Sequence, residues 1–82
     1  LLMALIRCMC CGYKTLGAPA SMGLCPVCWW DDDGQDDSDA YVVRNTANGS
    51  LSLAQARQNY QQIGASDVRF LQHVRVPLPE EF

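Results

Sequence analysis

Apolar residues recur with helical spacing in one segment of the chain. Within residues 53–63 they stand three and four positions apart, which places them along one face of a helix. This apolar stripe consists of Leu53, Ala56, Tyr60 and Ile63. Ser52 and Gln55 form the capping-box pattern of a helix start, and Gly64 stands where helices commonly end. The pattern therefore predicts a helix over residues 53–63 whose stripe packs into the core.

Three other segments have the composition of short strands. Residues 4–8, 13–16 and 40–44 are rich in apolar, aromatic and β-branched residues. Residues 17–21 and 45–50 are rich in turn-forming residues and are expected to form loops. We expect short antiparallel strands, with the first two joined by the turn between them.

The C-terminal part predicts less regular structure. One or two helical turns, capped by Ser66 or Asp67, should follow the main helix. Residues 74–76 are expected to be extended because Pro77 disfavours helix before it, and residues 79–82 to form an exposed tail. The expected fold class is thus α+β: one domain over residues 1–82, with one main helix and a second short one.

Four of the five cysteines form two Cys-x-x-Cys pairs. The pairs are Cys8–Cys11 and Cys25–Cys28, and 13 residues lie between them. Two such knuckles facing each other present four thiolates at tetrahedral corners, which is the donor set of structural zinc. The spacing therefore predicts one structural zinc ion in a zinc-ribbon-like site. Four protein ligands leave no open position for water, which argues against catalytic zinc.

Other roles for these side chains stay open at this point. Four thiolates also hold iron, and a redox dithiol would place one Cys-x-x-Cys at a helix start in a longer chain. The fifth cysteine, Cys10, is either an inert neighbour of the metal, a replacement ligand or a redox sensor. His73 is far from the knuckles in sequence and is expected to be a surface or packing residue.

Chain length and cysteine usage favour a metal-stabilised protein in a reducing compartment. Domains shorter than roughly 70–80 residues often need a metal or disulfide staple, and this chain has 82. An odd number of cysteines in paired spacing favours metal over disulfides. The apolar run at residues 1–6 is too short for a signal peptide or a membrane span. We therefore expect a soluble cytoplasmic protein without membrane contact.

An acidic segment follows the second knuckle and begins with Trp29 and Trp30. Its six aspartates are Asp31, Asp32, Asp33, Asp36, Asp37 and Asp39. It is either a solvated loop with one tryptophan packed on the knuckle, or a docking surface for a basic cleft. It fits a calcium loop poorly, since Gly34 at the sixth position puts Trp29 first and Ala40 twelfth. The net charge of −3 argues against general nucleic-acid binding.

The knuckles and the residues after them resemble the cysteine-rich CPCC domain family, which is named for a Cys-Pro-Cys-Cys-Gly-Tyr opening. The matching segments are Cys8-Met9-Cys10-Cys11-Gly12-Tyr13 and Cys25-Pro26-Val27-Cys28-Trp29-Trp30 with the aspartates that follow. The resemblance extends from Met3 to Glu81, with Met9 in place of the family's proline. It implies a small, bacterial, non-enzymatic zinc-binding domain, and some relatives belong to interbacterial toxin systems.

We therefore expect a non-enzymatic, zinc-stabilised protein-binding domain. Its partner would be a protein, and the resemblance suggests an immunity or inhibitor protein that neutralises a toxin with a basic cleft. Acid–base catalysis lacks parts, because His73 is the only histidine. The alternatives are a nucleic-acid-binding zinc ribbon and a thiol-based redox or metal-handling protein that uses Cys10.

Overall fold

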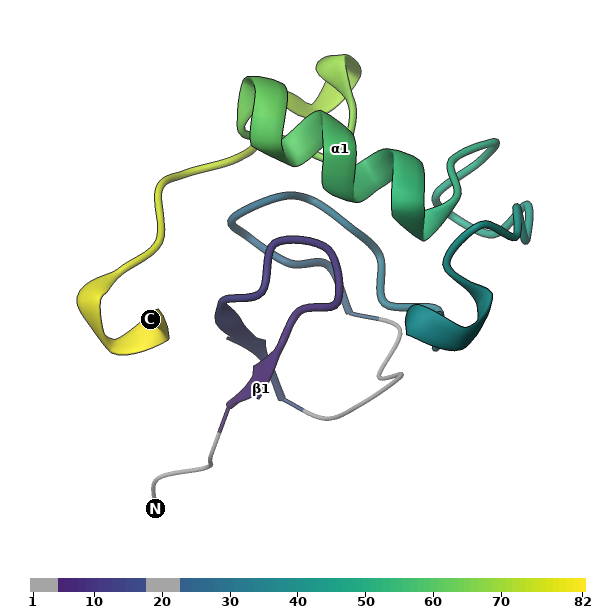
Figure 1. The fold of residues 1–82 in the computed structure, drawn as a ribbon. Coiled ribbons are helices and arrows are strands. Elements are labelled where there is room, and N and C mark those ends of the chain that lie inside the picture. The colour runs from purple at the N-terminus through teal and green to yellow at the C-terminus, as the bar shows by residue number, and fades with distance from the viewer. Residues whose placement is uncertain (1–4, 18–22) are drawn as a thin grey trace.

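The fold was determined as a computed structural model that describes residues 5–17 and 23–82 (Figure 1). Its strands are β1 (Ile6–Arg7) and β2 (Lys14–Leu16), and its helix is α1 (Leu53–Ile63). Three 3-10 turns complete the regular structure: η1 (Asp37–Asp39), η2 (Val68–Phe70) and η3 (Pro79–Glu81). The loop predicted at residues 17–21 lies, except for Gly17, outside the described residues.

The first two predicted strands pair as an antiparallel hairpin. Ile6 lies opposite Leu16 and Arg7 opposite Lys14, with an irregularity in register between the two positions. Both strands are shorter than predicted, because the chain leaves β1 at Cys8 to enter the first knuckle. Leu16 is buried and anchors the hairpin to the core.

The prediction of a strand at residues 40–44 is wrong. Val43 makes only an isolated bridge to Ser52, and the chain turns where the N–H of Val42 donates to the carbonyl of Asp39 at 2.9 Å. The side-chain amide of Gln35 donates to the carbonyls of both Asp39 and Val42, at 2.9 and 2.6 Å. The buried Gln35 side chain therefore forms hydrogen bonds with carbonyls that a neighbouring strand would need. These local bonds outweigh the β propensity of the segment.

Helix α1 has the predicted bounds. The hydroxyl of Ser52 accepts from the N–H of Gln55 at 3.1 Å, and Gly64 ends the helix at φ 80° with its N–H on the carbonyl of Tyr60. The capping box is only half formed, because the Gln55 side chain turns forward and donates to Asn59 Oδ1 at 2.8 Å. Local sequence signals thus decide both ends of this helix.

The core lies between α1 and the two knuckles, over which α1 passes in Figure 1. Leu53 and Ala56 are buried against it, and Tyr60 is partly buried. Ile63 is 41% exposed, so the predicted stripe holds over only its first three members. Trp30 is the largest fully buried side chain. No helix in the described part of the chain combines the length and hydropathy of a membrane span.

Residues 79–82 are exposed as predicted except at Glu81, which is buried and holds the C-terminal segment against the rest of the chain. Asp67 caps η2, as predicted. Arg75 donates from both Nη atoms to the carboxylate of Glu81, each at 2.8 Å, and this pairing lowers the pKa of Glu81. The N–H of Leu78 donates to the same carboxylate, and Glu81 is buried. The chain end returns to the hairpin, where Phe82 meets Tyr13 edge to face.

Candidate metal centre

Both Cys-x-x-Cys pairs fold into the same turn. The carbonyl of Cys8 accepts from the N–H of Gly12, and the carbonyl of Cys25 accepts from the N–H of Trp29, each at 2.8 Å. A second bond, of 2.8 Å in the first turn and 3.0 Å in the second, joins the N–H of each first cysteine to the carbonyl five residues later. Two segments that are separate in the sequence therefore form equivalent knuckles.

The residue after each knuckle is left-handed, and only one of the two is glycine. Gly12 has φ 83° and Trp29 has φ 69°. A left-handed conformation costs a residue with a Cβ atom about 1–2 kcal/mol, which glycine avoids. The Trp29 ring stacks on His73, with centroids 5.0 Å apart and planes inclined by 19°. The sequence marked Trp29 as an anchor candidate but contained no signal of its backbone strain.

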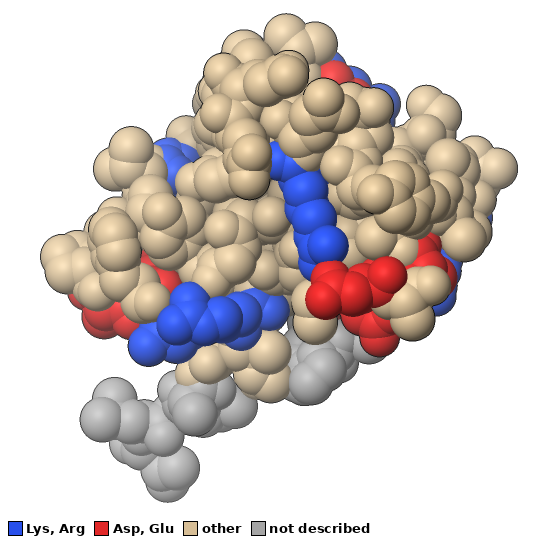
Figure 2. All heavy atoms as spheres, in the orientation of Figure 1, with Lys and Arg blue, Asp and Glu red and all other residues tan. Residues whose placement is uncertain are grey.

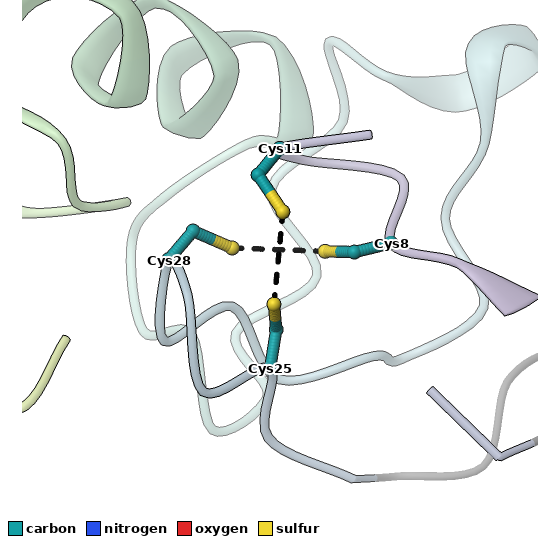
Figure 3. A group of neighbouring side chains, drawn as sticks. All are labelled: Cys8, Cys11, Cys25 and Cys28. Carbon is teal, nitrogen blue, oxygen red and sulfur yellow. Dashed lines mark hydrogen bonds between the residues drawn. The ribbon is translucent and has the colours of Figure 1, made fainter. Parts of the chain in front are cut away.

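The knuckles bring four sulfur atoms to a common centre (Figure 3). The Sγ atoms of Cys8, Cys11, Cys25 and Cys28 all lie within 4.8 Å of one another. Cys8 Sγ is 3.6 Å from Cys28 Sγ, and Cys11 Sγ is 3.7 Å from Cys25 Sγ. A tetrahedron with zinc–sulfur distances of about 2.3 Å has sulfur–sulfur edges of about 3.8 Å. These two separations are close to such edges and the other four stay within 4.8 Å, so the cluster can hold a tetrahedral metal ion.

The sulfurs are too far apart for disulfides, whose S–S length is about 2.05 Å, and all five cysteines are free thiols. Cys8, Cys25 and Cys28 are buried, and Cys11 is partly exposed. Cys10 is buried beside the cluster but is not one of the four grouped ligands, and its N–H donates to Cys8 Sγ at 3.4 Å. Its burial fits an inert neighbour better than a reactive thiol.

Neighbouring thiols shift the pKa values of Cys25 and Cys28 in opposite directions. Hydrogen bonds from the thiols of Cys11 and Cys28 lower the pKa of Cys25. The surrounding thiols, that of Cys10 first among them, raise the pKa of Cys28. Four thiolates this close repel one another, and a divalent cation removes that penalty by binding all four in their charged form.

Two polar groups outside the ligand set contact the sulfurs. The Thr15 hydroxyl on β2 lies 2.9 Å from Cys25 Sγ, and the backbone N–H of Cys10 supports Cys8. Burial is the main reason that the pKa of Tyr60 is raised to about 12, and the charge of Cys11 is the second. The Tyr60 phenol therefore stays neutral. Sequence reasoning missed Thr15, because the hairpin that brings it to the second knuckle is a tertiary feature.

Comparison with known proteins places the chain in a family. The family model described as cysteine-rich CPCC matches residues 6–81, which is nearly the whole chain. The chain belongs to the cysteine-rich CPCC family. Its first knuckle reads Cys8-Met9-Cys10-Cys11, with methionine in place of the proline of the family name. No curated protein and no solved structure matches the chain.

The acidic segment of this CPCC domain is ordered by hydrogen bonds at both ends. Asn48 accepts from the N–H of Asp31 and donates to its carbonyl, at 2.9 and 2.7 Å. Asp39 pairs with Arg44, whose second Nη donates to the carbonyl of Asp33. Burial and the nearby carboxylates raise the pKa of Asp31. The segment is therefore a fixed part of the surface.

The docking residues predicted from the sequence differ in exposure. Trp30 and Asp32 are buried, so neither offers its side chain to a partner. Asp37 is 88% exposed and pairs with Arg57 of α1 at 2.8 Å. Asp36 is exposed and accepts from the hydroxyl of Ser38 at 2.5 Å and from the N–H of the same residue at 2.8 Å, and these bonds lower its pKa. Figure 2 shows acidic side chains in separate groups on this face, with basic side chains against them.

The structure also exposes apolar side chains that the sequence assigned to a strand. Tyr41 is 87% exposed, and Val42 and Val43 beside it are exposed as well. All three directly follow the acidic segment. The sequence pattern could not predict that these side chains are exposed, because it assumed that residues 40–44 pair as a strand, and they do not.

Proposed function

We propose that the four cysteines hold one structural zinc ion, and that the domain so stabilised is a non-catalytic protein-binding module. The observation that carries the first part is the tetrahedral spacing of four sulfurs from two equivalent knuckles. Zinc takes four thiolates in this geometry without an open position. Cys8, Cys11, Cys25 and Cys28 are the ligands in this proposal.

Metal analysis tests the zinc part directly. The protein is purified under reducing conditions, and its metal content and absorption spectrum are measured. We expect one zinc per chain and a colourless solution. Iron in stoichiometric amount, with the visible absorption of iron–thiolate bonds, would replace zinc in the proposal, since the same four ligands suit both. A chain without metal, containing disulfides, would contradict the metal site itself.

Two features support a binding role over an enzymatic one. The four ligands fill the coordination sphere, and the single histidine, His73, is stacked on Trp29. Exposed carboxylates at Asp36 and Asp37 stand on a segment that is held rigid, with Tyr41 nearby in sequence. Rigid surfaces lose little conformational entropy on binding, and negative charge steers basic partners.

The narrower form of the proposal is an immunity or inhibitor protein that covers the basic cleft of a toxin. Affinity purification of the full chain from its host should recover one stoichiometric protein partner, whose activity the chain inhibits. Replacing Asp36 and Asp37 together by asparagine should weaken the complex, whereas Glu80→Gln should not. Retention of the same partner by the unfolded Cys28→Ser chain would show that the capture is nonspecific, and would contradict the proposal.

A further inference from the structure

Three consecutive apolar side chains lie at the surface directly after the acidic segment. Tyr41 is 87% exposed, Val42 50% and Val43 45%. Of the large apolar side chains that the structure describes, Tyr41 is the most exposed. Single exposed apolar residues are common on soluble proteins, but adjacent ones that include an aromatic ring are typical of interaction sites. We call the side chains of Tyr41, Val42 and Val43 the 41–43 patch.

The backbone beneath the 41–43 patch is held from several sides. The carbonyl of Ala40 accepts at 2.8 Å from an N–H in the first turn of α1, which places the segment beside the start of this helix (Figure 1). The carbonyl of Val42 accepts from the amide nitrogen of Gln35 at 2.6 Å, and Val43 bridges to Ser52. The patch is therefore presented in a fixed position, and a partner that covers it orders little additional backbone.

Exposed carboxylates stand at the beginning of the same turns. The N–H of Asp39 donates to the carbonyl of Asp36, and the N–H of Val42 donates to the carbonyl of Asp39. These successive bonds wind the chain as a 3-10 helix does, with a rise of about 2 Å per residue. The backbones of Asp36 and Tyr41 are therefore about 10 Å apart at most, and one contact surface can cover both.

The charge beside the 41–43 patch is negative. Both nearby arginines are already engaged, because Arg57 pairs with Asp37 and Arg44 pairs with Asp39. Asp36 is exposed, and its Oδ1 accepts from the hydroxyl and the N–H of the residue two positions later. No described residue donates to its Oδ2. This oxygen can therefore accept from a basic side chain of a partner without breaking a bond within the chain.

We propose that the 41–43 patch and Asp36 together dock a protein partner that presents an aliphatic side chain beside an arginine. The aliphatic side chain lies on Val42 and Val43 against the Tyr41 ring, and the guanidinium pairs with Asp36. Arginine suits this place better than lysine, because its guanidinium is more weakly hydrated than an ammonium group and is enriched at interfaces. The exposed carboxylates repel phosphates, which favours a protein over a nucleic acid.

This inference rests on the proposed binding function and names the surface and the chemistry of its partner. The test uses the zinc-loaded full chain and the peptide acetyl-Leu-Arg-Gly-Leu-Arg-amide, followed by amide NMR spectra. One control peptide has citrulline in place of both arginines, which keeps their shape and removes their charge. The other has serine in place of both leucines, which removes their apolar contact.

We expect saturable shifts at residues 36, 37 and 40–43 with the first peptide. Each control peptide should bind about threefold more weakly or less tightly still, because charge and apolar contact both contribute. Equal binding of either control peptide would overturn the proposal. Shifts spread evenly over the protein, or confined to residues outside this surface, would overturn it as well.

Matched variants separate a defined surface from general attraction. Tyr41→Ala should raise the dissociation constant of the peptide about fivefold, whereas Val76→Ala, at a position that is 81% exposed in the C-terminal segment, should leave it unchanged. Asp36→Asn keeps the cap of η1, because asparagine caps as well as aspartate, and should raise the constant about threefold. Glu80→Gln removes the same charge from an exposed position on η3 and should not. Equal effects within either pair would contradict the proposal.

Two other occupants of the 41–43 patch give different spectra. If the same amides shift when the protein concentration is raised without peptide, the patch joins two copies of this chain and the proposed partner is wrong. If single-stranded oligouridine shifts them more strongly than the peptide does, the chemistry proposed for the partner is wrong.

The outcome also separates this inference from the proposed function. If the zinc-loaded chain captures a stoichiometric host protein and Tyr41→Ala captures it equally well, the 41–43 patch is not the docking surface and the binding module stands. If the chain holds no metal and no partner, the proposed function fails and the docking surface fails with it.

Discussion

The two knuckles have the same backbone turn but different surroundings. The first exposes Met9 where the second has the half-buried Pro26, and the first follows its turn with glycine at position 12, whereas the second follows its turn with a strained Trp29. Trp30, which closes the second turn, is fully buried, whereas Tyr13, at the equivalent place after the first turn, is only partly buried. The same local turn therefore packs to different depths in its two copies.

The largest expected effect is common to both knuckles. Cys28→Ser removes one ligand of four, and the remaining three leave the domain without most of its metal-derived folding free energy. We expect loss of zinc and of cooperative thermal unfolding, as measured by metal analysis and circular dichroism. Cys10→Ser, adjacent in space but outside the ligand group, is the control and should keep its zinc. An unchanged melting temperature in Cys28→Ser would rule out a structural metal.

The aromatic residue that closes each turn should separate the two knuckles. Trp30→Ala empties the largest buried site and should cost about 3–5 kcal/mol, whereas Tyr13→Ala, at the equivalent but partly exposed position, should cost less. Chemical denaturation of the zinc-loaded proteins measures both. Trp30→Phe serves as a control, since it keeps most of the volume and removes an indole N–H that has no partner among residues 5–17 and 23–82. Equal losses at positions 13 and 30 would refute the difference in burial.

The support of the sulfurs also differs between knuckles. Cys8 is supported by a backbone N–H of its own turn, but Cys25 depends on the Thr15 hydroxyl from the hairpin. Thr15→Val keeps the shape and removes this donor, and should lower zinc affinity about tenfold in a chelator competition. Thr46→Val, at an exposed threonine remote from the cluster in sequence, is the matched control. Unchanged affinity in Thr15→Val would show that the contact does not tune the metal.

The smallest effect concerns the left-handed residues. Gly12→Ala meets no atom within 4 Å but adopts φ 83°, so backbone strain alone should cost about 1 kcal/mol. At position 29 the substitution by glycine removes strain instead of adding it. Trp29→Gly relieves the backbone but also loses the stacking on His73. Trp29→Gly should therefore be more stable than Trp29→Ala by about 1 kcal/mol, measured from denaturation midpoints. The opposite order would mean that Trp29 is not strained.

Local signals in the sequence predicted the parts of the fold that form within a few residues. Ser52 and Gly64 bound helix α1 because a cap needs only neighbouring backbone groups. The Cys-x-x-Cys spacing brought each pair of sulfurs together for the same reason, and the family match agrees with it. The hairpin was also recognisable, although the knuckle shortened its strands.

Contacts between distant residues decided the rest, and no local pattern contains them. The Gln35 amide bound the Val42 carbonyl, which a strand at residues 40–44 would have paired, and Arg75 paired with the buried Glu81. Burial likewise separated Trp30, in the core, from Trp29, on His73. By itself the sequence determined the knuckles, the helix and the four candidate ligands, because their geometry is set by neighbouring residues. Only the tertiary structure decided which acidic and aromatic side chains reach the surface, since exposure depends on what the whole chain packs against.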